Sequence, residues 1–114
     1  MNKNGIMEKM PSGETVQTVA DAMKQLGDPS RLRIFWLLCH CEECVINIAS
    51  ATEMSSPAVS HHLRLLKNAK LISATRHGKE MYYRAANTPM VEKLHHTIEE
   101  IAKISCPEWH DKFE

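Results

Sequence analysis

The sequence lacks several features that would assign it to other classes of protein. It contains no apolar run of about 18 residues, so we expect no membrane-spanning helix. Its first ten residues have no apolar centre of the kind that a secretory signal requires. It also has no Gly-rich phosphate loop, no nucleophile elbow and no HExxH pair. We therefore expect a cytoplasmic protein that is not an enzyme and has no membrane partner.

The charges are unevenly placed along the chain. At 114 residues the sequence predicts one domain with a small core, which dimerisation would help to stabilise. Lys and Arg balance Asp and Glu at 14 each, yet residues 55–84 hold six basic residues against one acid, a net charge of +5. A basic segment within an otherwise acidic chain is typical of a surface that binds phosphate.

Apolar spacing predicts two helices before the basic segment. Residues 15–26 have apolar side chains every three or four positions, and Gly27 ends the pattern. Asp28 and Pro29 then form a strong helix start, with Asp as the N-cap and Pro at the first helical position. The helix over 29–38 is dense in large apolar residues, which indicates the centre of the core.

A helix-turn-helix is predicted next. A short helix over 45–51 precedes a turn over 52–56, and Ser55 or Ser56 caps a second helix. In that helix Val59, Leu63 and Leu66 share one face. The opposite face carries short polar groups and an arginine, which suit the edge of a DNA groove.

A hairpin and a last helix complete the pattern. Residues 71–76 and 80–84 alternate and are rich in β-forming side chains, and the turn between them contains Gly78. Thr88 and Pro89 then open a helix with a narrow apolar seam. We expect this seam and the first helix to form a dimer interface, made of Val16, Val19, Met23, Val91, Leu94, Ile98 and Ile101. Packing within one chain is the alternative.

These elements predict a fold that is mainly α with a small β-hairpin, a dimeric winged helix-turn-helix. We expect a flexible N-terminal arm over 1–12, the DNA-binding and dimerisation domain over 13–105 and a C-terminal tail over 106–114. The predicted partner is double-stranded operator DNA, bound by a homodimer with two half-sites about one helical turn apart. The candidate DNA-contacting residues are Ser56, Pro57, Ser60, His61, His62, Arg64, Lys67, Arg76, His77, Lys79 and Arg84. For His62, a bond that braces the motif is equally expected.

The cysteines predict an effector site. Cys39, Cys41 and Cys44 lie within six residues, and Cys106 lies far along the chain. Three thiolates can hold a soft metal or metalloid ion such as As(III), Cd(II), Pb(II) or Zn(II), with His40 or Cys106 as a fourth ligand. The rival interpretation is redox sensing through a disulfide or persulfide.

Several stretches resemble the ArsR/SmtB family of bacterial metal- and stress-sensing repressors, over about residues 15–104. The resemblance is carried by residues 26–34, 56–66 and 76–84, which read LGDPSRLRI, SPAVSHHLRLL and RHGKEMYYR. It implies a dimeric winged-helix repressor that binds an inverted-repeat operator and is released by its inducer. A winged-helix module that binds protein and has no effector is the alternative, although it would not need the basic segment.

Two metal sites of that family are incomplete in this chain. Cys44 matches one cysteine of the first site, but Ile46 stands where the second would be. The second site would fall on Asn87, Pro89, Glu100 and Lys103, which do not preserve it. His95 and His96 lie close by on the last predicted helix, with Glu92, Glu99 and Glu100 one turn away. A displaced site there is an alternative to exposed His–Glu pairs.

Overall fold

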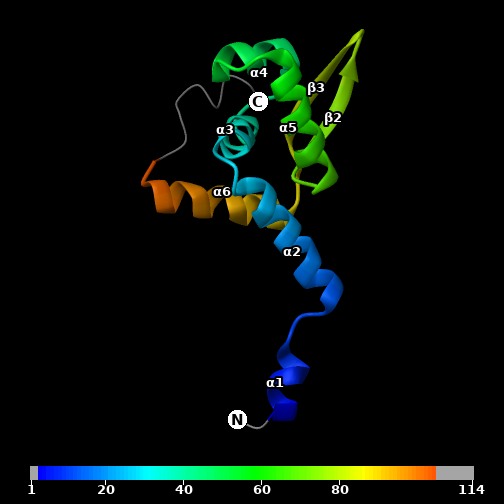
Figure 1. Cartoon of the computed structure of the whole chain (residues 1–114), viewed down its shortest axis with the longest axis vertical. Helices are drawn as coiled ribbons and strands as arrows, with labels where there is room; N and C mark the ends of the chain where they lie inside the picture. Colours follow the sequence, from blue (N-terminus) through cyan, green and yellow to red (C-terminus); the bar gives the residue numbers. More distant parts are fainter. Residues whose placement is uncertain (1–2, 105–114) are drawn as a thin grey trace.

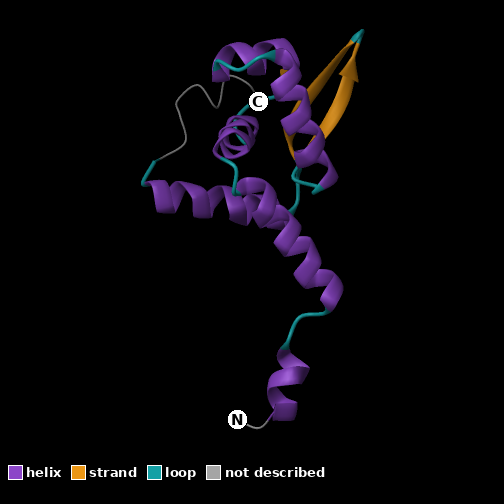
Figure 2. Cartoon of the chain, in the orientation of Figure 1, coloured by secondary structure: helices purple, strands orange, loops and turns teal. Residues whose placement is uncertain are grey.

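The computed structural model describes residues 3–104, and most of them form helices (Figures 1 and 2). Cys106 and the rest of the predicted tail lie outside the described residues. The elements are α1 (Lys3–Lys9), α2 (Gly13–Leu26), α3 (Pro29–Leu38), β1 (Glu43–Cys44), α4 (Val45–Thr52), α5 (Ser56–Asn68), β2 (Ile72–His77), β3 (Glu80–Ala85) and α6 (Pro89–Ala102). The prediction of a mainly α winged helix-turn-helix is confirmed.

Side-chain caps set where the helices begin. The carboxylate of Asp28 accepts a hydrogen bond from the backbone N–H of Arg31 at the start of α3. Ser55 and Thr88 do the same three residues ahead at the starts of α5 and α6. Each cap satisfies a backbone donor that a helix otherwise leaves unpaired. Ser12 caps α2 in the same way, so that helix begins two residues before the predicted start at residue 15.

The sheet has one strand more than the sequence predicted. The hairpin β2–β3 pairs in antiparallel register, and β1 adds to the other side of β3 in the order β1-β3-β2. Glu43 pairs with Tyr83 and Cys44 with Tyr82. Because β1 is only two residues long, it has no alternating pattern by which a strand is normally recognised. Gly78 turns the hairpin with a φ of 66°, which costs little without a Cβ.

The core lies where α3 meets α4, α5 and the base of the sheet. Its fully buried side chains include Ile34 and Phe35 from α3, Ile48 from α4 and Leu66 from α5. Each of these apolar side chains contributes about 1.5–3 kcal/mol when taken out of water. The core therefore holds α5 by one face and leaves its other face exposed.

The segment predicted as a loose arm contains α1, which lies away from the other helices (Figure 1). Within the described range, no helix is both long enough and apolar enough to cross a membrane.

Candidate nucleic-acid interface and metal centre

The outer face of α5 is polar and open to solvent. Val59, Leu63 and Leu66 are buried, as their spacing predicts. The predicted DNA-contacting residues on the opposite side of this helix are exposed, namely Ser56, Pro57, Ser60, His61, Arg64 and Lys67. All of them lie off the buried face of the helix, so their face of α5 is open to a ligand.

Two of these residues contact each other. A guanidinium nitrogen of Arg64 lies 3.0 Å from Nδ1 of His61. Since arginine can only donate, Nδ1 of His61 accepts, and a neutral His61 carries its hydrogen on Nε2. The pair therefore presents the remaining guanidinium N–H groups and an imidazole N–H donor to solvent.

His62 occupies a different environment. Its side chain is half-buried, and its Nδ1 is buried with no hydrogen-bond partner within the part of the chain that the structure describes. Burial lowers the pKa of His62 below 6.5, against the opposing effect of the Asp28 carboxylate. This placement, close to the start of α3, favours a role inside the motif over a DNA contact.

The hairpin β2–β3, called the wing below, extends the basic surface beyond α5. Arg76, Lys79 and Arg84 are exposed on the hairpin and its turn. His77 is exposed too, but its Nε2 lies 2.7 Å from a carboxylate oxygen of Glu42 in the loop before β1. His77 therefore ties the wing to that loop, and a phosphate contact would have to compete with this pairing.

The predicted dimer residues fall into two groups. Val16, Val19 and Met23 on α2 and Ile101 on α6 are exposed apolar side chains. Leu94 and Ile98 are partly buried against the core, and Val91 is only 4% exposed within a single chain. Val91 is therefore a core residue and leaves little surface for a second copy, because its place on α6 faces the domain and not the solvent.

The three clustered cysteines are not brought together as a ligand set. The Cys41 thiol donates to the carbonyl of Leu37, 3.4 Å away, and Cys44 is buried at the start of α4. Burial raises the pKa of Cys41 to about 11, so in the metal-free chain its thiol stays protonated at neutral pH and is a poor nucleophile. Among residues 3–104, the geometry does not support the predicted three-thiolate site.

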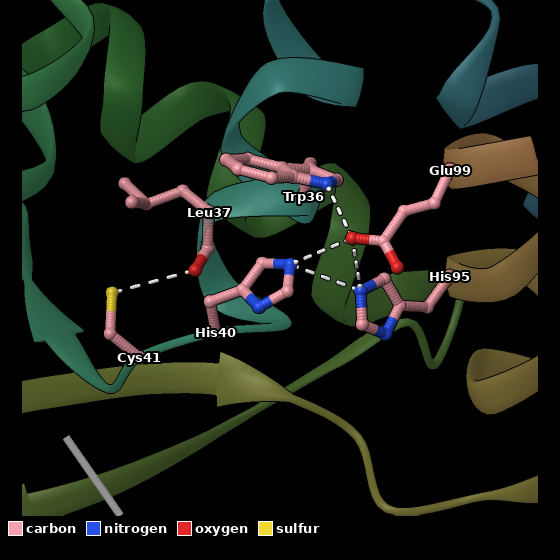
Figure 3. A network of polar contacts seen from close by, with 6 residues as sticks. All are labelled: Trp36, Leu37, His40, Cys41, His95 and Glu99. Atoms are coloured by element: carbon pink, nitrogen blue, oxygen red, sulfur yellow. Dashed lines mark hydrogen bonds and ion pairs between the residues drawn. The ribbon is translucent and has the colours of Figure 1, made fainter. Parts of the chain in front are cut away.

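Three other side chains, those of His40, His95 and Glu99, do bring their potential ligand atoms together. Nε2 of His40 lies 3.2 Å from Oε2 of Glu99, Nε2 of His95 lies 3.1 Å from the same oxygen, and the two nitrogens are 3.0 Å apart (Figure 3). His40 follows α3, and the other two residues are one turn apart on α6. Trp36 donates its indole N–H to that carboxylate oxygen at 3.3 Å. The Cys41 thiol points away from these atoms, toward Leu37 (Figure 3).

The group of His40, His95 and Glu99 is buried on the side of His40 and Glu99, and solvent reaches it on the side of His95. His40 is 2% exposed and Glu99 8%, whereas His95 is half-buried and also lines a pocket of about 450 Å³. That pocket runs along the start of α6, past Cys39, Glu92 and His96. In the part of the chain that the structure describes, this is the one group of three such side chains whose ligand atoms converge.

Sequence reasoning did not join His40 to the other two residues. It placed His40 as an added ligand of the cysteines, and it placed His95 near Glu99 only in the alternative of a displaced site on the last helix. The spacing of His95 and Glu99, four residues apart on one helix, was a usable signal. The approach of His40 depends on how α3 packs near α6, which the local sequence does not encode.

Known proteins share this architecture. The model for "Bacterial regulatory protein, arsR family" matches residues 28–74, which span α3, α4, α5 and the start of β2. The solution structure of a homodimeric winged helix-turn-helix DNA-binding domain from Mycobacterium bovis superposes with a TM-score of 0.72 at 33% identity. That comparison covers 83% of this chain and 90% of that domain.

Curated relatives that are similar in sequence to this chain are also transcriptional regulators. A transcriptional repressor SmtB homolog from Synechocystis is 37% identical over 82 residues, which are 72% of this chain and 62% of that protein. A cadmium resistance transcriptional regulatory protein CadC homolog from Staphylococcus aureus is 41% identical over 66 residues, which are 57% of this chain and 54% of that protein. The matched region thus spans somewhat more than half the length of these two relatives.

The family consists of transcriptional regulators and not of enzymes, in agreement with the sequence expectation. This chain belongs to the ArsR family of bacterial regulatory proteins.

Proposed function

We propose that this protein is a transcriptional repressor of the cytoplasm, which binds an inverted-repeat operator as a homodimer and releases it when a metal ion binds. The observation that carries the proposal is the exposed, polar and basic face of α5 beside an exposed basic wing. In Figure 1 the hairpin lies alongside α5 and projects beyond it. Such a helix can enter a major groove while the wing contacts flanking phosphates.

The residues of this face fall into two groups, one that contacts base edges and one that contacts phosphates. Ser56, Ser60 and His61 are short hydrogen-bonding groups that can approach base edges, and Arg64 can reach a guanine. Lys67 on α5 and the wing residues Arg76, Lys79 and Arg84 bind phosphate and provide the salt-dependent part of the affinity. We leave His62 out of this set because its half-buried position suits a supporting role.

The dimer places two such faces on one DNA. Val16, Val19 and Met23 on α2 are 47%, 42% and 61% exposed, and Ile101 on α6 is 78% exposed. A second copy would cover these apolar side chains and remove them from water. The homodimeric state of the M. bovis domain supports the same arrangement here. Val91 is not part of this proposed interface.

A metal ion is the proposed inducer. The S. aureus relative is named for cadmium resistance, which supports a metal response in this chain. The thiols of Cys39, Cys41 and Cys44 do not converge as a group of three, which does not favour As(III) or Pb(II), since such soft ions prefer several thiolates. A divalent transition-metal cation fits the described residues better, because imidazole and carboxylate groups are the ones that converge.

Fluorescence anisotropy with DNA from upstream of the protein's own coding region tests the DNA-binding part. The metal-free protein should bind this DNA more tightly than a shuffled sequence of the same composition. The affinity should fall as salt rises, since each neutralised phosphate releases a counterion. Equal affinity for both DNAs, or no binding at low salt, would overturn the repressor proposal.

A further inference from the structure

The spacing of three ligand atoms matches that around a small metal ion. Nε2 of His40, Nε2 of His95 and Oε2 of Glu99 form a triangle with sides of 3.0, 3.1 and 3.2 Å. A tetrahedral ion with bonds of about 2.0–2.1 Å holds its ligand atoms about 3.3 Å apart, and an octahedral ion holds adjacent ligands about 2.9 Å apart. The separations of the three atoms therefore lie between those expected for one face of an octahedral shell and one face of a tetrahedral shell.

Hydrogen bonds alone do not account for this triangle. An imidazole nitrogen either carries a hydrogen and donates, or has a lone pair and accepts. If His40 and His95 both donate to Glu99, their two N–H groups face each other across 3.0 Å. If one imidazole accepts from the other, that nitrogen has no hydrogen left for Glu99. No placement of hydrogens gives all three contacts a hydrogen bond of their own, whereas a cation attracts all three lone pairs at once.

We propose that His40, His95 and Glu99 bind a divalent first-row transition-metal cation such as Zn(II). Two imidazoles and one carboxylate are a donor set that such ions accept readily. Trp36, by donating its indole N–H to Oε2 of Glu99 at 3.3 Å, holds the carboxylate toward the two imidazoles. The pocket beside His95 provides an entry path and leaves room for water to complete the coordination shell.

The site joins two parts of the fold that matter for DNA binding. His40 lies between α3 and β1, just before the helix-turn-helix, and His95 and Glu99 lie on α6, which carries part of the proposed dimer surface. An ion bound to both fixes α6 relative to the segment that leads into α4. As an effector site this inference rests on the proposed function, but the binding of the ion itself is measured without DNA.

Binding of Co(II) to the full-length metal-free protein tests the proposal. The expected result is one ion per chain with visible d–d absorption and no intense near-ultraviolet band from sulfur-to-cobalt charge transfer. Zn(II) should then displace the Co(II). An intense charge-transfer band would place the ion on cysteines and overturn this assignment, and so would the absence of specific binding.

Variants locate the site. His95→Asn and Glu99→Gln each remove one ligand with little change in size. Changes to groups that only orient a ligand weaken metal binding by about 10–100-fold, so loss of a direct ligand should weaken it at least tenfold. Glu100→Gln is the matched control for Glu99→Gln, because Glu100 is the next residue on α6, is exposed and lies outside the group of three. Equal weakening in Glu100→Gln, or none in Glu99→Gln and His95→Asn, would contradict the proposal.

The two proposals fail in different ways. If the metal-free protein binds its upstream DNA but takes up no Co(II) at this site, the repressor function stands and the metal site is wrong. If Co(II) binds as described but the protein never binds DNA, the site stands and the repressor function is wrong. Far-ultraviolet circular dichroism of each variant shows whether it is folded, and Glu99→Gln, which preserves an acceptor for Trp36, covers the case in which His95→Asn does not fold.

Discussion

His40 and His95 are 55 residues apart in the sequence, yet their Nε2 atoms lie 3.0 Å apart in the fold. The contact connects the turn after α3 to the middle of α6. Both rings face the same carboxylate oxygen of Glu99 (Figure 3). The fold thus brings the proposed effector group close to the base of the helix-turn-helix while leaving the outer face of α5 untouched.

Arg64 is expected to read bases. Arg64→Ala should lower operator affinity by about 1–3 kcal/mol and reduce the preference for operator over shuffled DNA. Arg64 also donates to His61, so the variant loses the orientation of that ring as well. Anisotropy titrations measure the effect, with Lys93→Ala on the exposed side of α6 as the control. A loss of the same size on operator and shuffled DNA would show that Arg64 contacts only phosphate.

Lys79 is expected to contact phosphate from the turn of the wing. Lys79→Ala should weaken binding to operator and shuffled DNA alike, and the slope of log affinity against log salt should become shallower by about 1. The measurement is the same titration repeated over several salt concentrations. An unchanged slope would exclude Lys79 from the interface.

Val19 is expected to lie in the dimer interface. Val19→Glu places a charge on an exposed apolar position of α2, so the free energy of unfolding of a single chain should change by no more than about 0.5 kcal/mol. Sedimentation velocity should show a dimer for the parent protein and a monomer for Val19→Glu. Thr18→Glu, also exposed on α2, should remain dimeric. A dimeric Val19→Glu variant would place the interface elsewhere.

His62 is expected to make stability depend on pH. Burial lowers its pKa below 6.5 in the folded chain, so between the folded and unfolded pKa values the unfolded chain binds more protons. The stabilisation is complete above 6.5 and is lost as pH falls through the folded pKa. Urea unfolding at about pH 7.5 and about pH 5.5 should show a larger loss for the parent than for His62→Gln. Equal losses would contradict the assignment.

Local signals in the sequence account for most of the helices. Asp28, Ser55 and Thr88 each precede a proline and an apolar pattern, and all three cap the helices that the sequence predicted. The exposed face of α5 followed from the spacing of its buried residues. β1 was missed because a two-residue strand is defined by its partner β3 and not by its own residues.

The group proposed as the effector site, His40, His95 and Glu99, was harder to predict because it depends on packing. The close spacing of Cys39, Cys41 and Cys44 favoured a shared site, but the chain turns after α3 and then enters β1 and α4, and their thiols do not converge. His40 was brought to α6 by tertiary structure alone. Nearness in sequence did not bring the cysteine thiols together, whereas the turn after α3 approaches one face of α6 and places His40 beside His95 and Glu99.

Titration of Zn(II) into the preformed complex of protein and operator DNA tests the central claim most directly. Fluorescence anisotropy of the labelled DNA should fall as Zn(II) is added to the parent protein. His95→Asn should bind the same DNA without metal and keep it bound at Zn(II) concentrations that release the parent. Equal release of DNA by both proteins would contradict the account, and so would a parent complex that Zn(II) does not dissociate.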